Sequence, residues 1–249
     1  MAQQLKWQLG TVVEIRQETP SVKSLILHLP GGTMHLAGQH VDVRLTAEDG
    51  YQAQRSYSIA SAPEDKYLML TVENVDDGEV SPYLTGVLQI GEQLELRGPI
   101  GGYFVWSASD ARDTSSPLLL VAGGSGVAPL MAMLRHRANA GHKVPVKLLY
   151  SSRSYEDIIY REELEHLVEN DPSLRVIHTL TRQQPEDWTG YGRRIDREML
   201  AEAGWPAADN PLVYTCGPTA LVETVANYLL ELGYESERIK TERFGPTGG

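Results

Sequence analysis

Two different patterns of hydrophobic and polar positions divide this chain near residue 107. Before that point, short β-like runs recur between turn sequences such as Asp49-Gly50 and Asp77-Gly78. Short strands separated by turns at these intervals predict an antiparallel sandwich or barrel. The strands expected from the pattern are Thr11–Ile15, Ser24–Leu29, His40–Leu45, Tyr67–Val75 and Gln93–Arg97.

After residue 117 the pattern changes to strands that alternate with helices. Leu118–Ala122 is an unbroken apolar run, which is typical of a buried parallel strand. Further strands are expected at Val144–Tyr150, Arg175–Thr181 and Leu212–Thr215, and helices at Leu130–Ala140, Asp157–Glu169, Asp196–Ala203 and Thr219–Leu232. The alternation predicts a doubly wound parallel sheet. The polar residues 108–117 are interpreted as a structureless linker between domains of residues 1–107 and 118–249.

Composition excludes several classes of protein. The 249 residues carry a net charge of −11 and no lysine- or arginine-rich run, which argues against a nucleic-acid partner. The single cysteine, Cys216, excludes a disulfide framework and an iron–sulfur cluster within the chain, and it favours a reducing, cytoplasmic location. The histidines lack the spacing of a zinc site, so no metal is expected. Glycines interrupt the uncharged stretch Pro117–Leu134, so no membrane insertion is expected.

A glycine-rich turn follows the first strand of the second half. Glycines allow a ligand to approach the backbone closely, and a helix N-terminus offers free N–H groups to a pyrophosphate. The pattern G-x-G-x-x-P differs from the usual dinucleotide fingerprint, and a turn that binds nothing would have the same sequence. Val127 stands where a nucleophile elbow needs glycine, which disfavours a serine hydrolase. The residues of this turn are Gly123, Gly124, Ser125, Gly126, Val127, Ala128 and Pro129.

The end of the next expected strand bears on the choice of nucleotide. An NAD site of this architecture has a carboxylate there, which binds the ribose. Here the strand ends in Ser151, Ser152 and Arg153, and the later arginines Arg182 and Arg194 follow the next strand and loop. Guanidinium groups favour a 2′-phosphate, so the pattern favours NADPH over NADH. Each arginine taken singly is as compatible with a solvated surface position.

Three short motifs in a fixed order resemble the ferredoxin–NADP reductase family. They are Arg55-Ser56-Tyr57-Ser58, then the turn at 123–129, then Cys216-Gly217-Pro218. Gly98-Pro99 and Val80-Ser81 also fall where that family's flavin domain places them. The resemblance covers essentially the whole chain. It implies an antiparallel Greek-key flavin barrel followed by a doubly wound NAD(P)-binding domain.

The resemblance also implies roles for residues of the first half. Arg55 and Ser56 would both bind the flavin, and Arg55 would neutralise its phosphate or pyrophosphate. Tyr57 would lie against the isoalloxazine, and Ser58 would form a hydrogen bond near its N5. Val80 and Ser81, at the start of a helix running to Leu88, would present N–H groups and a hydroxyl to phosphate. Main chain near Val72 and Asn74 would border the flavin. Without the other motifs, Arg55–Ser58 would be read as a plain edge strand.

Residues near the end of the chain are expected at the nicotinamide. The resemblance places Cys216 beside it, with Gly217 and Pro218 shaping the hydride path; the alternative is a buried core cysteine. Glu242 and Phe244 match a carboxylate and an aromatic that covers the flavin face in the family. Plant-type members end on that aromatic, typically tyrosine, whereas this sequence has phenylalanine and five further residues. A final strand with a core phenylalanine is the alternative for Phe244.

Together these features predict a flavin-dependent oxidoreductase that takes hydride from NADPH onto FAD, with FMN the less favoured flavin. Because one cysteine cannot hold an iron–sulfur cluster, electrons are expected to pass to a separate acceptor: a ferredoxin, a flavodoxin or an oxygenase partner. The charge of −11 disfavours an acidic ferredoxin. Two alternatives remain open. One is an NAD(P)H:flavin or quinone reductase acting on small acceptors, and the other is a flavin-bearing electron-entry or regulatory subunit without turnover of its own.

Overall fold

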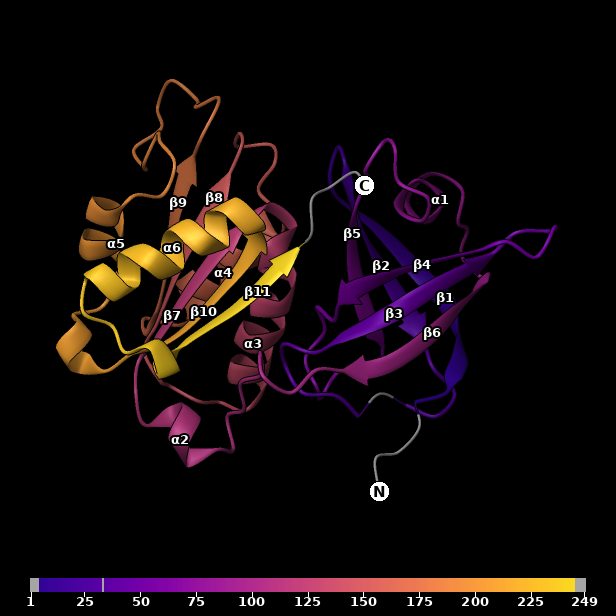
Figure 1. Ribbon diagram of the computed structural model, residues 1–249, viewed down its shortest axis with the longest axis horizontal. Coiled ribbons are helices and arrows are strands. Elements are labelled where there is room, and N and C mark those ends of the chain that lie inside the picture. Colours follow the sequence, from indigo (N-terminus) through magenta and orange to yellow (C-terminus); the bar gives the residue numbers. More distant parts are fainter. Residues whose placement is uncertain (1–4, 33, 245–249) are drawn as a thin grey trace.

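The computed structural model describes residues 5–32 and 34–244, which form two sheets, one from each half of the chain (Figure 1). The first sheet is antiparallel, with the strand order β4-β3-β6-β1-β2-β5. Its strands are β1 (Trp7–Thr19), β2 (Val22–His28), β3 (His40–Thr46), β4 (Gln52–Ser58), β5 (Leu68–Glu73) and β6 (Gln93–Ile100).

The outer strands β4 and β5 meet and close this sheet into a barrel. Ile59, just after β4, pairs with Leu70 of β5, and Ala60 N donates to Met69 O at 2.8 Å. Alternate side chains of the strands point inward and are fully buried, among them Leu25, Leu27, Val43, Leu70 and Leu96. The helix α1 (Ser81–Gly86) packs on the barrel through its buried Leu84.

The second sheet is parallel throughout, with the order β11-β10-β7-β8-β9. All six residues of its central strand β7 are buried, as the unbroken apolar run predicts. The strands are β7 (Leu118–Gly123), β8 (Val146–Ser152), β9 (Leu174–Leu180), β10 (Leu212–Pro218) and β11 (Ile239–Phe244). The predicted barrel and doubly wound sheet are therefore both confirmed.

Helices cover both faces of the parallel sheet. Buried side chains of α3 (Val127–Asn139) and α4 (Arg161–Asn170) join one apolar cluster. Those of α5 (Arg197–Ala203) and α6 (Thr219–Glu231) join another, on the opposite face. The described residues also form short 3-10 turns: η1 (Gly124–Gly126), η2 (Ala207–Asp209) and η3 (Ser236–Arg238). Among the described residues, no helix combines the length and apolar character needed to cross a membrane.

Three segments differ from the sequence-based expectation, and one of them, β11, is expected from the sequence only as the alternative for Phe244. The stretch expected to be structureless contains a short helix, α2 (Ala111–Thr114), because the side chain of Asp110 caps it by accepting from Arg112 N at 2.9 Å. Strand β4 falls outside the expected strands, since its sequence is mainly polar and most of its residues are exposed. Its pairing with β3 is complete, from His40–Ser58 to Thr46–Gln52.

Candidate active site

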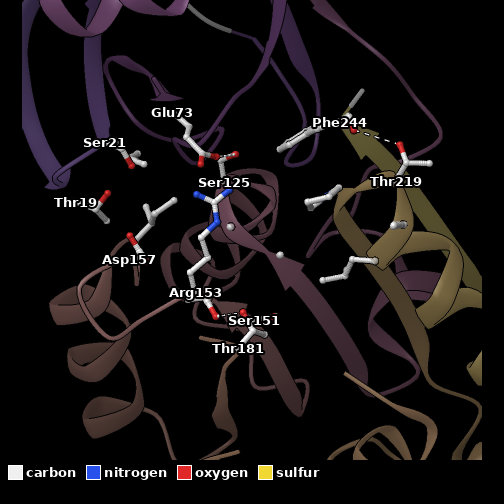
Figure 2. A pocket seen from close by; sticks show the side chains of 18 residues that line it. Thr19, Ser21, Glu73, Ser125, Ser151, Arg153, Asp157, Thr181, Thr219 and Phe244 are labelled. Atoms are coloured by element: carbon white, nitrogen blue, oxygen red, sulfur yellow. Dashed lines mark hydrogen bonds between the residues drawn. The ribbon is translucent and has the colours of Figure 1, made fainter. Parts of the chain in front are cut away.

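A cleft of ≈ 600 Å³ lies between the barrel and the carboxyl ends of the parallel strands (Figure 2). In open α/β sheets, ligands bind at this edge because the loops after the strands converge there. The barrel contributes Thr19, Ser21, Val22 and Glu73 to the lining. The other sheet contributes Gly123, Gly124, Ser125, Ser151, Ser152, Arg153, Asp157, Ile159, Thr181, Pro218, Thr219, Ala220, Leu221 and Phe244.

Two turns of the cleft pack backbone against backbone, which only glycine permits. A Cβ at Gly126 would lie 2.3 Å from Cys216 O, and one at Gly217 would lie 2.9 Å from Gly123 O. Gly217 has φ +148° and Gly124 has φ +53°, conformations that side chains rarely adopt. The Tyr150 hydroxyl donates a hydrogen bond of 3.2 Å to Gly124 O and so helps to fix the turn that contains Gly124 and Gly126.

The predicted glycine turn is only partly exposed to the cleft. Gly123, Gly124 and Ser125 line it, whereas Val127, Ala128 and Pro129 are buried against the sheet. Neither Gly123, the N-cap of η1, nor Gly126, the N-cap of α3, provides a side-chain cap, and the Val127 N–H already bonds to Gly124 O and Ser125 O. Among the described residues, the N–H groups that lack a capping side chain here are therefore those of Gly124–Gly126. The N-terminal end of α3, together with η1, therefore carries the partial positive charge that favours an anion.

Ser58 and Glu242 meet across the boundary between the two sheets. Ser58 Oγ donates to Glu242 Oε1 at 3.1 Å. Burial raises the pKa of Glu242 to about 7, and the hydrogen bond from Ser58 opposes that shift. A carboxyl with this pKa can hold or release a proton near neutral pH.

Cys216 lies next to Glu242 in the register of β10 and β11 and is fully buried. Burial raises the pKa of its thiol, and the nearby Glu242 adds to the effect. The thiol therefore stays protonated at neutral pH and does not act as a nucleophile. Phe244 ends β11 and lines the cleft while packing against buried residues, so it is neither fully exposed nor a core residue.

The motif Arg55–Ser58 presents its side chains on two sides of β4. Arg55 is exposed and its Nη2 donates to Glu79 at 2.9 Å; Tyr51 also donates to Glu79. Tyr57 packs against the barrel core, and burial raises its pKa to about 12. Ser56 Oγ donates to Asp42 Oδ1 at 2.6 Å.

The remaining predicted flavin residues cluster between β5 and α1. Val72 is buried in the barrel, so only its main chain is available to a ligand. Asn74 Oδ1 accepts from Thr85 of α1 at 3.3 Å. Val80 is the buried N-cap residue of α1, and Ser81 Oγ accepts from Val75 N at 3.1 Å. A Cβ at Gly78 would lie 2.9 Å from Ser81 Oγ, so this loop needs glycine to fold tightly over the helix start.

The three arginines predicted at the 2′-phosphate lie in different settings. Arg153, at the end of β8, extends into the cleft (Figure 2). Arg182 and Arg194 are exposed and do not line it, although Arg182 N donates to Arg153 O at 2.9 Å. Ser152, also predicted here, lines the cleft but is buried.

Sequence reasoning missed two acidic residues of the cleft. Asp157 lies near the end of β8, and its Oδ2 accepts from Ser154 N at 3.1 Å and Ser154 Oγ at 2.8 Å. The Ser-x-x-Asp spacing indicates this turn but carries no sign of a ligand. Glu73 is the last residue of β5 and reaches Ser125, a contact between distant parts of the chain that leaves no trace in local sequence.

Two family models match this chain, one for each half. The model described as oxidoreductase FAD-binding domain matches residues 9–105. The model described as oxidoreductase NAD-binding domain matches residues 120–227.

Similar proteins and structures match nearly the whole chain, across both of its halves. Ferredoxin–NADP reductase B of Sorangium cellulosum is 35% identical over 246 residues, which cover 94% of this chain and 96% of that protein. The phenol hydroxylase P5 protein of Acinetobacter pittii is 29% identical over 237 residues; the match covers 94% of this chain but only 65% of that relative. The FAD/NAD-binding domain of the nitric oxide dioxygenase of Vibrio cholerae superimposes with a TM-score of 0.84 at 25% identity, covering 96% of this chain and 99% of that structure.

Proposed function

Because this chain belongs to the ferredoxin–NADP reductase-like family of FAD- and NAD(P)H-dependent oxidoreductases, we propose that it takes hydride from NADPH onto FAD and passes the electrons to a separate acceptor. The observation that carries this proposal is the Ser58–Glu242 hydrogen bond, 3.1 Å long, at the boundary of the two sheets. It brings together a residue of the predicted flavin motif and a carboxyl whose pKa lies near neutrality. We infer that a nicotinamide entering the cleft approaches a flavin on the barrel near this pair.

The barrel residues fit a flavin nucleotide. Arg55 presents an exposed guanidinium, and the loop at Gly78 folds tightly over Ser81 at the start of α1, a setting suited to phosphate. Tyr57 offers a flat, partly buried surface for a ring. When bound there, FAD supplies the electron-accepting ring. Ser58 and Glu242 would orient the ring edge and hold a proton at the Glu242 carboxyl.

The parallel sheet supplies the groups for the nucleotide. We assign the pyrophosphate to the turn Gly123–Ser125 and the start of α3, and the 2′-phosphate of NADPH to Arg153. Asp157, which could instead favour NADH by bonding a ribose hydroxyl, is already engaged by two groups of Ser154. Within residues 5–32 and 34–244, the Arg153 guanidinium forms no hydrogen bond or ion pair, so it is the group that we assign to the ligand. These roles correspond to a flavin domain of residues 1–107 and a nucleotide domain of residues 118–249.

The acceptor is proposed from the relatives. Several are reductase components of oxygenase systems, such as that of the naphthalene 1,2-dioxygenase system of Pseudomonas putida, which is 28% identical over 246 residues. We propose that this chain likewise delivers electrons to a separate oxygenase or electron-carrier component. The charge of −11 favours a partner with a basic docking face over an acidic ferredoxin. The single buried cysteine suits a reducing compartment, so we propose a cytoplasmic location.

Anaerobic stopped-flow absorbance of the FAD-reconstituted protein tests the proposal. The visible flavin band is expected to bleach on mixing with NADPH, and more slowly with NADH. A protein that takes up no FAD, or whose bound flavin NADPH does not reduce, would refute the function. Faster bleaching with NADH would refute the coenzyme preference alone.

A further inference from the structure

Glu73 reaches out of the barrel and touches the glycine turn of the other sheet. Its Oε2 accepts a hydrogen bond of 2.8 Å from Ser125 Oγ. The same oxygen lies 3.9 Å from the point where a Cβ of Gly124 would stand. Figure 2 shows the carboxylate of Glu73 and the side chain of Ser125 directed toward each other. A carboxylate of the barrel therefore sits on the turn that the proposed function assigns to the coenzyme.

The position that Glu73 approaches is one that suits an anion. Neither η1 nor α3 has a side-chain cap at its N-terminus. The N–H groups of η1, which lack a capping side chain, and the aligned peptide dipoles of α3 together give this turn a partial positive charge. Gly124, which has no side chain and φ +53°, leaves the face of the turn open to close approach. Glu73 brings a negative charge to this face before any ligand arrives.

We propose that Glu73 competes with the pyrophosphate of the pyridine nucleotide for the Gly123–Gly126 turn, and so sets how tightly the coenzyme binds. The inference rests on the proposed function, because that function assigns the turn to the pyrophosphate. Two anions in a partly enclosed cleft repel each other more strongly than in bulk water. Binding must therefore break the Glu73–Ser125 hydrogen bond or place two negative charges side by side. Either consequence weakens the binding of the reduced and the oxidised coenzyme alike and speeds release of the product.

The variant Glu73→Gln isolates the charge. Its amide oxygen can still accept the hydrogen bond from Ser125, so the contact between the sheets is kept. Titration calorimetry on the FAD-loaded full chain should show NADP⁺ and ADP-ribose binding about tenfold tighter to the variant, equivalent to about 1.4 kcal/mol. The affinity for 2′-AMP, which has no 5′-pyrophosphate, should not change. The gain for NADP⁺ should shrink at high ionic strength, because salt screens the repulsion.

Glu156→Gln is the matched control, since it removes the same charge from an exposed residue adjacent to Asp157. It should leave NADP⁺ affinity nearly unchanged. Equal or weaker NADP⁺ binding by Glu73→Gln would overturn the proposal. It would show instead that Glu73 serves to hold the two sheets together through its hydrogen bond to Ser125. An equal gain for 2′-AMP, or for Glu156→Gln, would overturn it in favour of a general effect of net charge. In each of these cases NADPH still reduces the flavin, so the proposed function stands; wild-type protein that binds neither NADP⁺ nor ADP-ribose would overturn both.

Discussion

At the scale of single residues, Glu242 combines burial with a hydrogen bond to another part of the chain. Burial raises its pKa from 4.5 to about 7. Between these two pH values the folded protein keeps a proton that the unfolded chain has already released. The Glu242 contribution to stability therefore falls as pH rises through this window and is constant above it.

Replacing Glu242 by glutamine should remove this dependence on pH. We compare the unfolding free energy of Glu242→Gln with that of wild type at each pH. The difference is expected to favour the variant by on the order of 1–2 kcal/mol more at pH 8 than at pH 5, after allowance for partial solvent screening. Urea unfolding at both pH values measures the difference. Glu237→Gln, at an exposed position of η3, should behave alike at both. A Glu242→Gln effect that is the same at pH 5 and pH 8 would contradict the raised pKa.

Arg153 is the residue on which the proposed coenzyme preference depends. A charge-assisted hydrogen bond to a 2′-phosphate contributes about 1.5–3 kcal/mol, so Arg153→Ala should raise the KM for NADPH at least about tenfold. The KM for NADH should barely change, because NADH lacks that phosphate. Steady-state rates with ferricyanide as acceptor give both constants. Arg197→Ala, on the exposed side of α5, is the control. Equal losses with both coenzymes would show that Arg153 serves the fold or a contact common to both.

At the scale of elements, the cleft depends on two turns that approach within backbone contact. Gly126→Ala would place a Cβ 2.3 Å from Cys216 O, so β10 and the start of α3 must separate. The expected cost is about 2 kcal/mol of unfolding free energy, together with weaker NADP⁺ binding. Urea unfolding and NADP⁺ titration measure the two effects. Gly31→Ala, where a Cβ meets nothing within 4 Å, should show neither. A Gly126→Ala protein with wild-type stability would mean that the turn adapts without strain.

The elements also show how far sequence alone could lead. The parallel strands are predictable because burial on both faces leaves apolar runs such as Leu118–Ala122. Strand β4 is not, because its residues are polar and its pairing with β3 is a long-range property. The same limit applies to the site. The motifs mark Arg55, Ser58 and the glycine turn, whereas the contact of Glu73 with Ser125 exists only once the two sheets meet.

At the scale of the whole molecule, the cleft exists because the barrel and the parallel sheet are fixed to each other. Arg135 of α3 donates to Ala60 O of the barrel at 2.6 Å and to Glu163 of α4 at 2.7 Å. Beside it, Thr71 of β5 bonds to Tyr160 and, at 2.8 Å, to Ser24. The Arg135–Ala60 and Thr71–Tyr160 bonds join the barrel to the half of the chain that forms the parallel sheet. They therefore set the distance across which a hydride must travel.

Arg135→Met should loosen this connection while keeping the apolar stem of the side chain. Loss of the bond to the Ala60 carbonyl and of the partner of Glu163 is expected to cost about 2 kcal/mol. Because the lost bond to Ala60 joins the barrel to α3, calorimetry should resolve two unfolding transitions where wild type shows one. The calorimetric enthalpy of the variant should no longer match the van't Hoff value. Arg97→Met is the control, because it breaks a 2.7 Å ion pair with Asp42 whose partners both belong to the barrel sheet. It should lower stability while leaving a single unfolding transition. A single transition in Arg135→Met would place the coupling of the two sheets in the remaining contacts, the Thr71–Tyr160 bond first among them.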